Sequence, residues 1–158
     1  MKRIYTILTP LLVTAGVVIS ISFVPRKSGC DSDALYQETL KKLNTFSLLK
    51  DYRVYMKNGK KNAPAEVMSF PITLNRGMKY KFFCAESKEY GGKLLFSLYT
   101  TRNSKPDFLF ATNYIKETGK VFESIEFQSE STVNCVIVFS FQEGKEGCGV
   151  GISSFLKD

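Results

Sequence analysis

The feature that most limits the fold of this chain is a period-two alternation of apolar and polar residues, which begins near residue 51. In residues 78–85, for example, Met78, Tyr80, Phe82 and Cys84 share one parity, and lysines separate the first three. Strands with this alternation bury one face against a core. Turn sequences separate the runs at regular spacing, and no sustained helical period interrupts them. The pattern predicts an all-β fold, an eight-stranded antiparallel, jelly-roll-like β-sandwich.

The predicted strands cover residues 52–57, 66–74, 78–85, 93–101, 108–114, 121–128, 133–142 and 148–156. Pro71 interrupts the second run and predicts an edge or bulged strand, because proline donates no backbone hydrogen bond. In the last run, Cys148, Val150 and Ile152 share a parity, and we expect them to face the core of the sandwich.

An apolar run without charge, residues 4–24, precedes this domain and follows two basic residues. That layout is typical of an export signal, and a helix of this length, about 30 Å, also spans a bilayer. We expect cleavage after Ser22, because Ser20 and Ser22 supply the small residues that a cleavage site needs. The alternatives are an uncleaved helix that contacts the membrane through residues 4–24, and a lipoprotein modified at Cys30. Each places the domain in the periplasm or cell envelope.

One short amphipathic helix is predicted between the apolar helix and the sandwich, within residues 30–44. Leu35, Leu40 and Leu43 form its partial apolar stripe, and residues 45–50 are expected to be a connector. The helix either packs on its own domain or docks a partner. The predicted division is a signal peptide or anchor (1–22), a linker with a short helix (23–50) and a β-sandwich domain (51–158).

The composition limits the chemistry that is available to the chain. It contains no histidine, which removes Ser-His-Asp and Cys-His catalysis and leaves only scattered ligands for zinc. No cofactor or metal is predicted. The net charge of +7 suits contact with acidic glycans or lipid headgroups. The alternative is that it only keeps the surface soluble. Export argues against a nucleic-acid partner.

Four cysteines, at positions 30, 84, 135 and 148, predict disulfide bonding in an exported chain. We expect a Cys84–Cys148 bridge, because both residues lie at strand ends on faces predicted to point inward. The alternative is buried free thiols that act as small apolar side chains.

Basic and aromatic residues gather on the predicted strands 52–57 and 78–85 and in the turns beside them. If those strands are neighbours, they form one cationic face suited to acidic sugar or phosphate groups. The alternative is a solvated sheet surface, where lysine also prevents aggregation. The predicted binding residues are Arg53, Tyr55, Lys57, Arg76, Lys79, Tyr80 and Lys81.

The glycines in GCGVG, residues 147–151, superficially suggest a nucleotide-binding loop. They begin a predicted strand and precede no helix, so no helix N-terminus is present to bind phosphate. We expect them to allow a bulge or close packing of the sheets.

Three segments, FPITLNRGMKYKFF, GKLLFSLYT and VNCVIVFSFQEGKEGCGVGIS, resemble the bacterial pre-peptidase C-terminal type of domain, a small jelly-roll-like sandwich on exported proteins. Residues 141–148 also resemble the FxEGKxGC segment that closes a group of short exported proteins from bacteria of the Bacteroidetes type. The resemblance implies a binding or accessory module and carries over no catalytic residue.

The sequence therefore predicts a non-enzymatic envelope protein that binds another protein, as an accessory subunit of a membrane or secretion assembly. A glycan-binding module that uses the basic and aromatic face is the alternative. An enzyme based on carboxylates such as Glu123 and Glu126 has weaker support, because their spacing equally fits the outward face of a strand.

Overall fold

A computed structural model describes residues 30–57, 66–103 and 105–156. The predicted export segment lies outside these residues. Within them, no helix is long and apolar enough to cross a bilayer. The elements are α1 (Ser32–Leu40), β1 (Phe46–Met56), β2 (Met68–Leu74), β3 (Lys79–Glu86), β4 (Leu94–Arg102), β5 (Lys105–Thr112), β6 (Tyr114–Ile115), β7 (Lys120–Val121), β8 (Ser124–Gln128), β9 (Val133–Phe141), a 3-10 turn η1 (Gln142–Gly144) and β10 (Gly147–Leu156).

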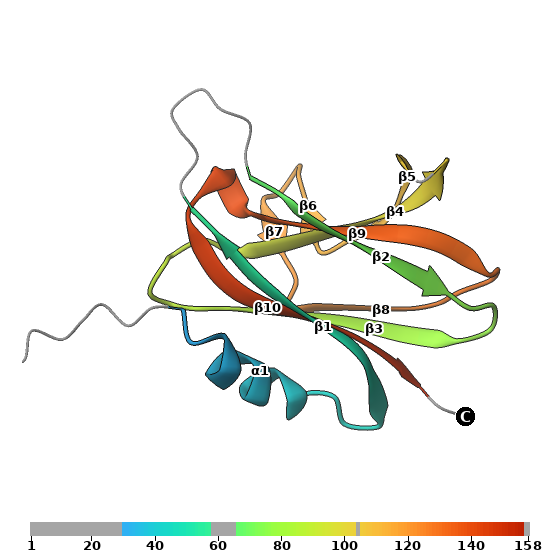
Figure 1. The fold of residues 1–158 in the computed structure, drawn as a ribbon, viewed down its shortest axis with the longest axis horizontal. Coiled ribbons are helices and arrows are strands. Elements are labelled where there is room, and N and C mark those ends of the chain that lie inside the picture. Colours follow the sequence, from blue (N-terminus) through green and yellow to red (C-terminus); the bar gives the residue numbers. More distant parts are fainter. Residues whose placement is uncertain (1–29, 58–65, 104, 157–158) are drawn as a thin grey trace, which may run out of the picture.

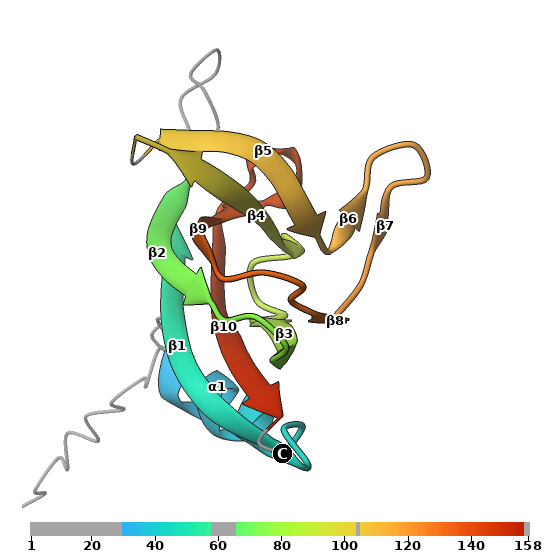
Figure 2. The same cartoon turned by 90° about the vertical axis from the view of Figure 1, so that its right-hand side faces the viewer.

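Two four-stranded antiparallel sheets pack face to face, as the period-two alternation predicts (Figure 1). The helix-side sheet has the order β1-β10-β3-β8, and α1 lies against its outer face. The open sheet has the order β2-β9-β4-β5, and no described element covers its outer face. A small ribbon, β6-β7, extends to one side (Figure 2). The all-β sandwich prediction is confirmed.

The space between the sheets is filled by the side chains that the alternation assigns to the core. Tyr80, Phe82 and Cys84 of β3 are buried there, as are Phe96 of β4 and Phe139 of β9. Aromatic rings pack across the layer, with centroids 5.8 Å apart for Phe82 and Phe96. Burial of each large apolar side chain stabilises the fold by about 2–3 kcal/mol relative to leaving it in water.

The glycines of β10 allow the two sheets to approach closely. A Cβ on Gly149 would lie 2.7 Å from the Ala85 carbonyl oxygen and 2.8 Å from a Leu94 methyl carbon. A Cβ on Gly147 or Gly151 would enter a ring of the opposite sheet, that of Phe141 or Phe139 respectively. The prediction of close sheet packing at these glycines is confirmed.

These glycines also correct the predicted orientation of β10. Because they occupy the face toward the other sheet, Val150 and Ile152 point the opposite way, toward α1, together with Phe83 of β3. Both faces of this central strand are buried, so the apolar residues alone do not indicate which face meets the opposite sheet.

Helix α1 packs on its own domain, which was one of the two predicted alternatives. Asp31 caps its first turn by accepting a hydrogen bond from the Ala34 N–H at 2.9 Å. Four apolar side chains then cover Phe83, Val150 and Ile152: Leu35, Tyr36, Leu40 and Leu43. This contact buries an apolar sheet face that would otherwise meet water.

The connector predicted at residues 45–50 is wrong, because β1 already begins at Phe46. The strand pairs with β10 from Phe46 opposite Leu156, but its register shifts between Leu48 and Lys50. That irregularity interrupts the period-two pattern, so the sequence of the first half of β1 does not show the alternation that predicts a strand. In contrast, β2 with Pro71 is an edge strand, as predicted.

Candidate functional site

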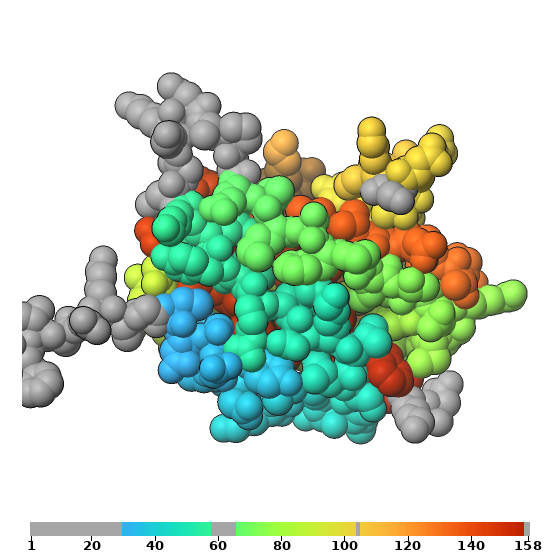
Figure 3. Space-filling view, in the orientation of Figure 1, coloured from blue at the N-terminus to red at the C-terminus, as the bar shows by residue number. Residues whose placement is uncertain are grey.

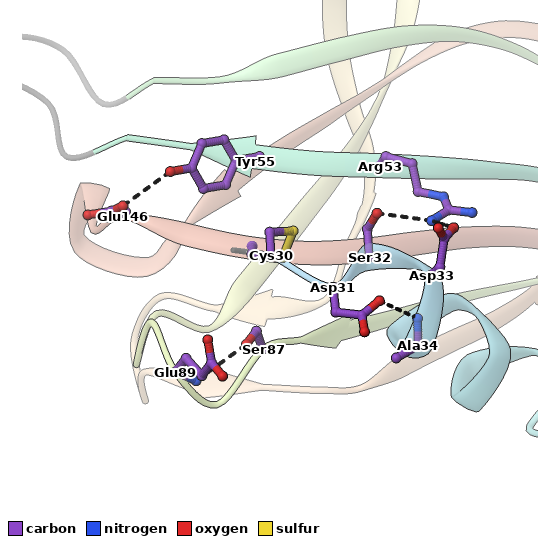
Figure 4. Close-up of a disulfide and its surroundings, with 11 residues drawn as sticks. Cys30, Asp31, Ser32, Asp33, Ala34, Arg53, Tyr55, Ser87, Glu89 and Glu146 are labelled. Atoms are coloured by element: carbon purple, nitrogen blue, oxygen red, sulfur yellow. Dashed lines mark hydrogen bonds and ion pairs between the residues drawn. A yellow bond between two sulfur atoms is a disulfide. The ribbon is translucent and has the colours of Figure 1, made fainter. Parts of the chain in front are cut away.

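The disulfide joins Cys30 to Cys148, with the Cα atoms 5.5 Å apart, so the predicted Cys84–Cys148 bridge is wrong (Figure 4). Cys148 is on the same parity as Val150 and Ile152, toward α1, whereas Cys84 belongs to the core between the sheets. The bridge therefore fastens the chain just before α1 to the start of β10.

Cys84 and Cys135 are buried free thiols, which was the predicted alternative to bridging. Burial raises the pKa of the Cys84 thiol well above its ordinary value, with a smaller contribution from the charge of Glu86. Burial also raises the pKa of Cys135. Neither side chain is present as the thiolate that a nucleophilic cysteine requires.

The predicted cationic face does not form as a single surface. β10 separates β1 from β3, so the two basic strands are not neighbours. Tyr80 is 2% exposed and accepts a hydrogen bond from the Asn75 N–H at 2.7 Å, so its ring is not on the surface. Arg76 lies in the turn between β2 and β3, and Lys57 lies just beyond β1.

Arg53 holds the helix to the sheet. Its guanidinium donates to Asp51 at 3.0 Å and to Asp33 at 2.7 Å, and these hydrogen bonds raise the pKa of Arg53. It also lies over the Tyr36 ring, 4.7 Å from the centroid. This basic residue therefore has acidic and aromatic partners within the chain.

Lys79 and Lys81 share one carboxylate. Lys79 Nζ lies 2.6 Å and Lys81 Nζ 3.7 Å from the two oxygens of Glu126. The hydrogen bond from Lys79 lowers the pKa of Glu126, and the charge of Lys81 adds to the effect. Glu126 thus acts as the partner of two lysines, and the binding role predicted for these lysines remains a prediction.

Tyr55 lies at the end of the sandwich near the disulfide (Figure 4). Its hydroxyl donates to Glu146 at 3.4 Å, and its ring meets Tyr90 edge-on with centroids 6.1 Å apart. Tyr55 is two residues beyond Arg53 on β1 but has different partners, Glu146 and Tyr90, so it belongs to a separate aromatic pair.

An open groove of about 510 Å³ lies between α1 and the segment that joins β3 to β4. Charged side chains line it, but ion pairs join several of them. Lys42 is 3.2 Å from Glu123, and Lys93 is 2.6 Å from Glu86, an interaction that raises the pKa of Lys93. In the described residues, no group of His, Cys, Asp or Glu side chains is arranged to hold a metal ion.

The outer face of the open sheet has a different character, which the strand registers reveal. We define the open face as three rows of outward side chains that cross β2, β9, β4 and β5. The middle row is apolar, and hydroxyl or amide groups dominate the rows on either side. The rows are Ser69, Val138, Ser97 and Thr112; then Pro71, Val136, Tyr99 and Leu109; then Thr73, Asn134, Thr101 and Pro106.

The polar groups of the open face are largely bonded to one another or to the backbone. Thr73 donates to the Asn134 side chain at 2.9 Å, and Thr101 donates to the Asn134 carbonyl at 3.2 Å. In the other polar row, the Ser97 and Thr112 hydroxyls are 3.2 Å apart, and Thr112 also donates to a backbone carbonyl at 2.9 Å. Polar groups that already have partners lose little when water is removed.

No side chain of the open face is charged, although 23% of the chain's residues are. Beyond the face, β5 exposes the apolar Phe108 and the charged Asp107, which pairs with Arg102; the strand projects at the upper right of Figure 3. Phe108 there is 68% exposed. A surface without charges, and with most of its hydroxyl groups already hydrogen-bonded, has a low free-energy cost of desolvation. It therefore suits contact with another apolar, uncharged surface.

The sequence alone does not predict this surface, because no cluster of charged or aromatic residues marks it. The signal was an absence: the outward positions of residues 69–73, 95–101 and 134–140 contain no Lys, Arg, Asp or Glu. Only the register between strands shows that these positions form continuous rows.

No protein-family model matches the chain, and no curated protein matches its sequence. The resemblance to the pre-peptidase C-terminal type of domain therefore remains a prediction. One solved structure with a related arrangement is Aeromonas hydrophila PliG, a periplasmic lysozyme inhibitor of g-type lysozyme. It aligns with a TM-score of 0.46 and 7% identity over 67% of this chain and 84% of that chain. At this level of similarity, the function of the present chain has to be argued from its own residues.

Proposed function

We propose that this chain is an exported, non-enzymatic protein of the bacterial cell envelope that binds another protein through the open face. The observation that carries the proposal is the charge-free surface, whose hydroxyl rows are hydrogen-bonded across the strands. On a solvated sheet face, charged residues are common at such positions. Here their absence lowers the cost of removing water when a partner binds.

Export is supported by the covalent structure and by the start of the chain. A Cys30–Cys148 bridge persists in the periplasm or outside the cell, whereas cytosolic thiols are kept reduced. Residues 4–24 have the composition of an export segment. The strand orders β1-β10-β3-β8 and β2-β9-β4-β5 support, as part of the proposal, the jelly-roll description of the fold.

A binding role is supported over catalysis by the side chains themselves. The chain has no histidine, and its two free thiols are buried with raised pKa values. The groove beside α1 contains carboxylates, but Glu86 and Glu123 are paired with lysines. The open face is therefore the surface best suited to function.

A photo-crosslinking amino acid placed at Ser97 tests this proposal in cells that export the chain. We expect a protein adduct of defined mass, and we expect Val136→Asp to abolish it because the aspartate would be desolvated at the centre of the contact. The control is the same crosslinker at Gln128, an exposed residue of β8 in the other sheet. Equal adducts from both positions, or none from Ser97, would refute the proposal. Retention of Ser97-labelled protein by polysaccharide without a protein adduct would favour the glycan alternative.

A further inference from the structure

The arrangement of the open face suggests a particular partner. We propose, on the basis of the function proposed above, that the surface covering it is the open face of a second copy of this chain. The two copies would pack face to face about a two-fold axis that lies between them and runs along the apolar middle row, over Val136 and Tyr99.

The order of the rows makes the open face complementary to itself. A two-fold axis that lies between the two copies, parallel to the rows, exchanges the two outer rows and keeps the middle row facing itself. Pro71, Val136, Tyr99 and Leu109 of one copy would then lie on the same apolar row of the other. The outer rows, which are rich in hydroxyl groups, would meet each other, and no charge would face another charge.

The charge of the rest of the chain favours this face over other surfaces for self-association. The chain has 22 Lys and Arg residues against 15 Asp and Glu, so two copies repel each other at most relative orientations. The open face avoids this repulsion locally. The ion pairs of Arg53 and Glu126 lie on the helix-side sheet, and that of Lys93 with Glu86 lines the groove beside α1, so contact through the open face leaves them in place. The Arg102–Asp107 pair joins the ends of β4 and β5 at the margin of the face.

Pairing along the edge strands β1, β2 and β5 is less favourable than pairing through the face. The edge strand β2 contains Pro71, and β5 contains Pro106 and two register shifts. On the helix-side sheet, β1 has a bulge between Leu48 and Lys50. Proline and bulges are features that prevent edge-to-edge hydrogen bonding. The outward side chains thus offer the better route to a second copy.

The size of the face determines how stable such a dimer should be. Strands about 4.8 Å apart and outward rows about 6.8 Å apart give a footprint of roughly 400 Å² a copy. Two footprints together are smaller than the roughly 1,200–2,000 Å² of a stable, specific interface. We therefore expect a dimer that dissociates on dilution.

Sedimentation velocity over a wide concentration range tests the inference on the exported, disulfide-bonded chain. The wild type should shift from monomer to dimer as its concentration rises. Val136→Asp should weaken the dimer at least about tenfold, because it places two carboxylates near the axis. Ser97→Asp provides a second variant in a neighbouring row. Ile115→Asp, on the β6-β7 ribbon and 40% exposed in the wild type, is the matched control and should leave the dimer unchanged.

The crosslinker at Ser97 separates this inference from the proposed function. An adduct of twice the chain mass, and a mixed adduct when two differently tagged copies are co-expressed, would support the dimer. A monomer at every concentration together with an adduct to a different protein would overturn the dimer and retain protein binding. A monomer without any adduct would overturn both. Unfolding temperatures close to that of the wild type establish that the aspartate variants are folded.

Discussion

Gly151→Ala tests the close contact between the two sheets. A Cβ at this position would enter the Phe139 ring, and the ring has no free direction in which to move. Phe139 is 1% exposed, and the rings of Tyr52, Phe70 and Phe96 lie 5.2, 6.1 and 6.3 Å from it, centroid to centroid. The variant therefore has to displace several packed side chains.

The expected loss follows from the difference between two effects. Overpacking of a buried site typically costs about 1–3 kcal/mol, and the enclosed ring places this site at the upper end. Replacing glycine in a strand recovers about 0.5–1 kcal/mol of backbone entropy. The free energy of unfolding should fall by about 2 kcal/mol, which is enough to lower the midpoint of thermal unfolding by several degrees.

Chemical denaturation followed by far-ultraviolet circular dichroism measures this change, since the chain has no tryptophan. Phe139→Leu makes room for the new methyl group, so the double variant should be more stable than the sum of the two single effects by about 1 kcal/mol or more. Gly119→Ala is the control. Gly119 has a φ of 68° and open space around it, so its substitution should cost about 1–2 kcal/mol and be additive with Phe139→Leu. A neutral Gly151→Ala, or additivity within about 0.5 kcal/mol with Phe139→Leu, would refute the reasoning.

Three further predictions concern covalent and ionisable groups. Replacing Cys30 and Cys148 together by serine should lower the free energy of unfolding by about 2–5 kcal/mol in urea, because the bridge spans 118 residues; an unchanged denaturation midpoint would contradict this. The Cys84 thiol should resist alkylation in the folded protein and react in denaturant. Because its pKa is raised in the folded protein, the thiol ionises above about pH 8.5 only in the unfolded chain, and the free energy of unfolding declines there. Cys84→Ala should remove the contribution of this thiol to the decline. The lowered pKa of Glu126 gives the opposite pH dependence. The ionised carboxylate contributes less than about 1 kcal/mol to the free energy of unfolding near neutral pH, because the group is exposed, and this contribution is lost as pH falls through the lowered pKa. Glu126→Gln should abolish this acid dependence in thermal unfolding measured across pH, and an identical pH profile would contradict the assignment.

Much of the fold could be predicted because its core strands are buried on one face. Tyr80, Phe82 and Cys84 were placed in the core from their parity alone, and the structure confirms this. The same rule failed for β10, which is covered by the other sheet on one side and by α1 on the other. There the small residues, Gly149 and its neighbours, rather than the large ones indicate the face that meets the opposite sheet.

The error in the predicted disulfide has the same origin. The parity rule assigns Cys148 to the wrong face and therefore predicts Cys84 as its partner, whereas the structure pairs Cys148 with Cys30. Tyr80 was correctly assigned to an inward face but was also included among the surface binding residues. The open face depends on the alignment of β2, β9, β4 and β5, which are distant in sequence. Local alternation contains no information about that alignment.

The Cys30–Cys148 bridge also determines how the domain bears mechanical load. A pull on the chain ahead of Cys30 passes through the bridge into β10 and leaves α1 outside the direct line of tension. β10 is a central strand, hydrogen-bonded to β1 on one side and to β3 on the other. The force is therefore shared between two ladders from the start. A segment attached ahead of Cys30 would transmit tension into the sandwich without separating α1 from the apolar sheet face that it covers.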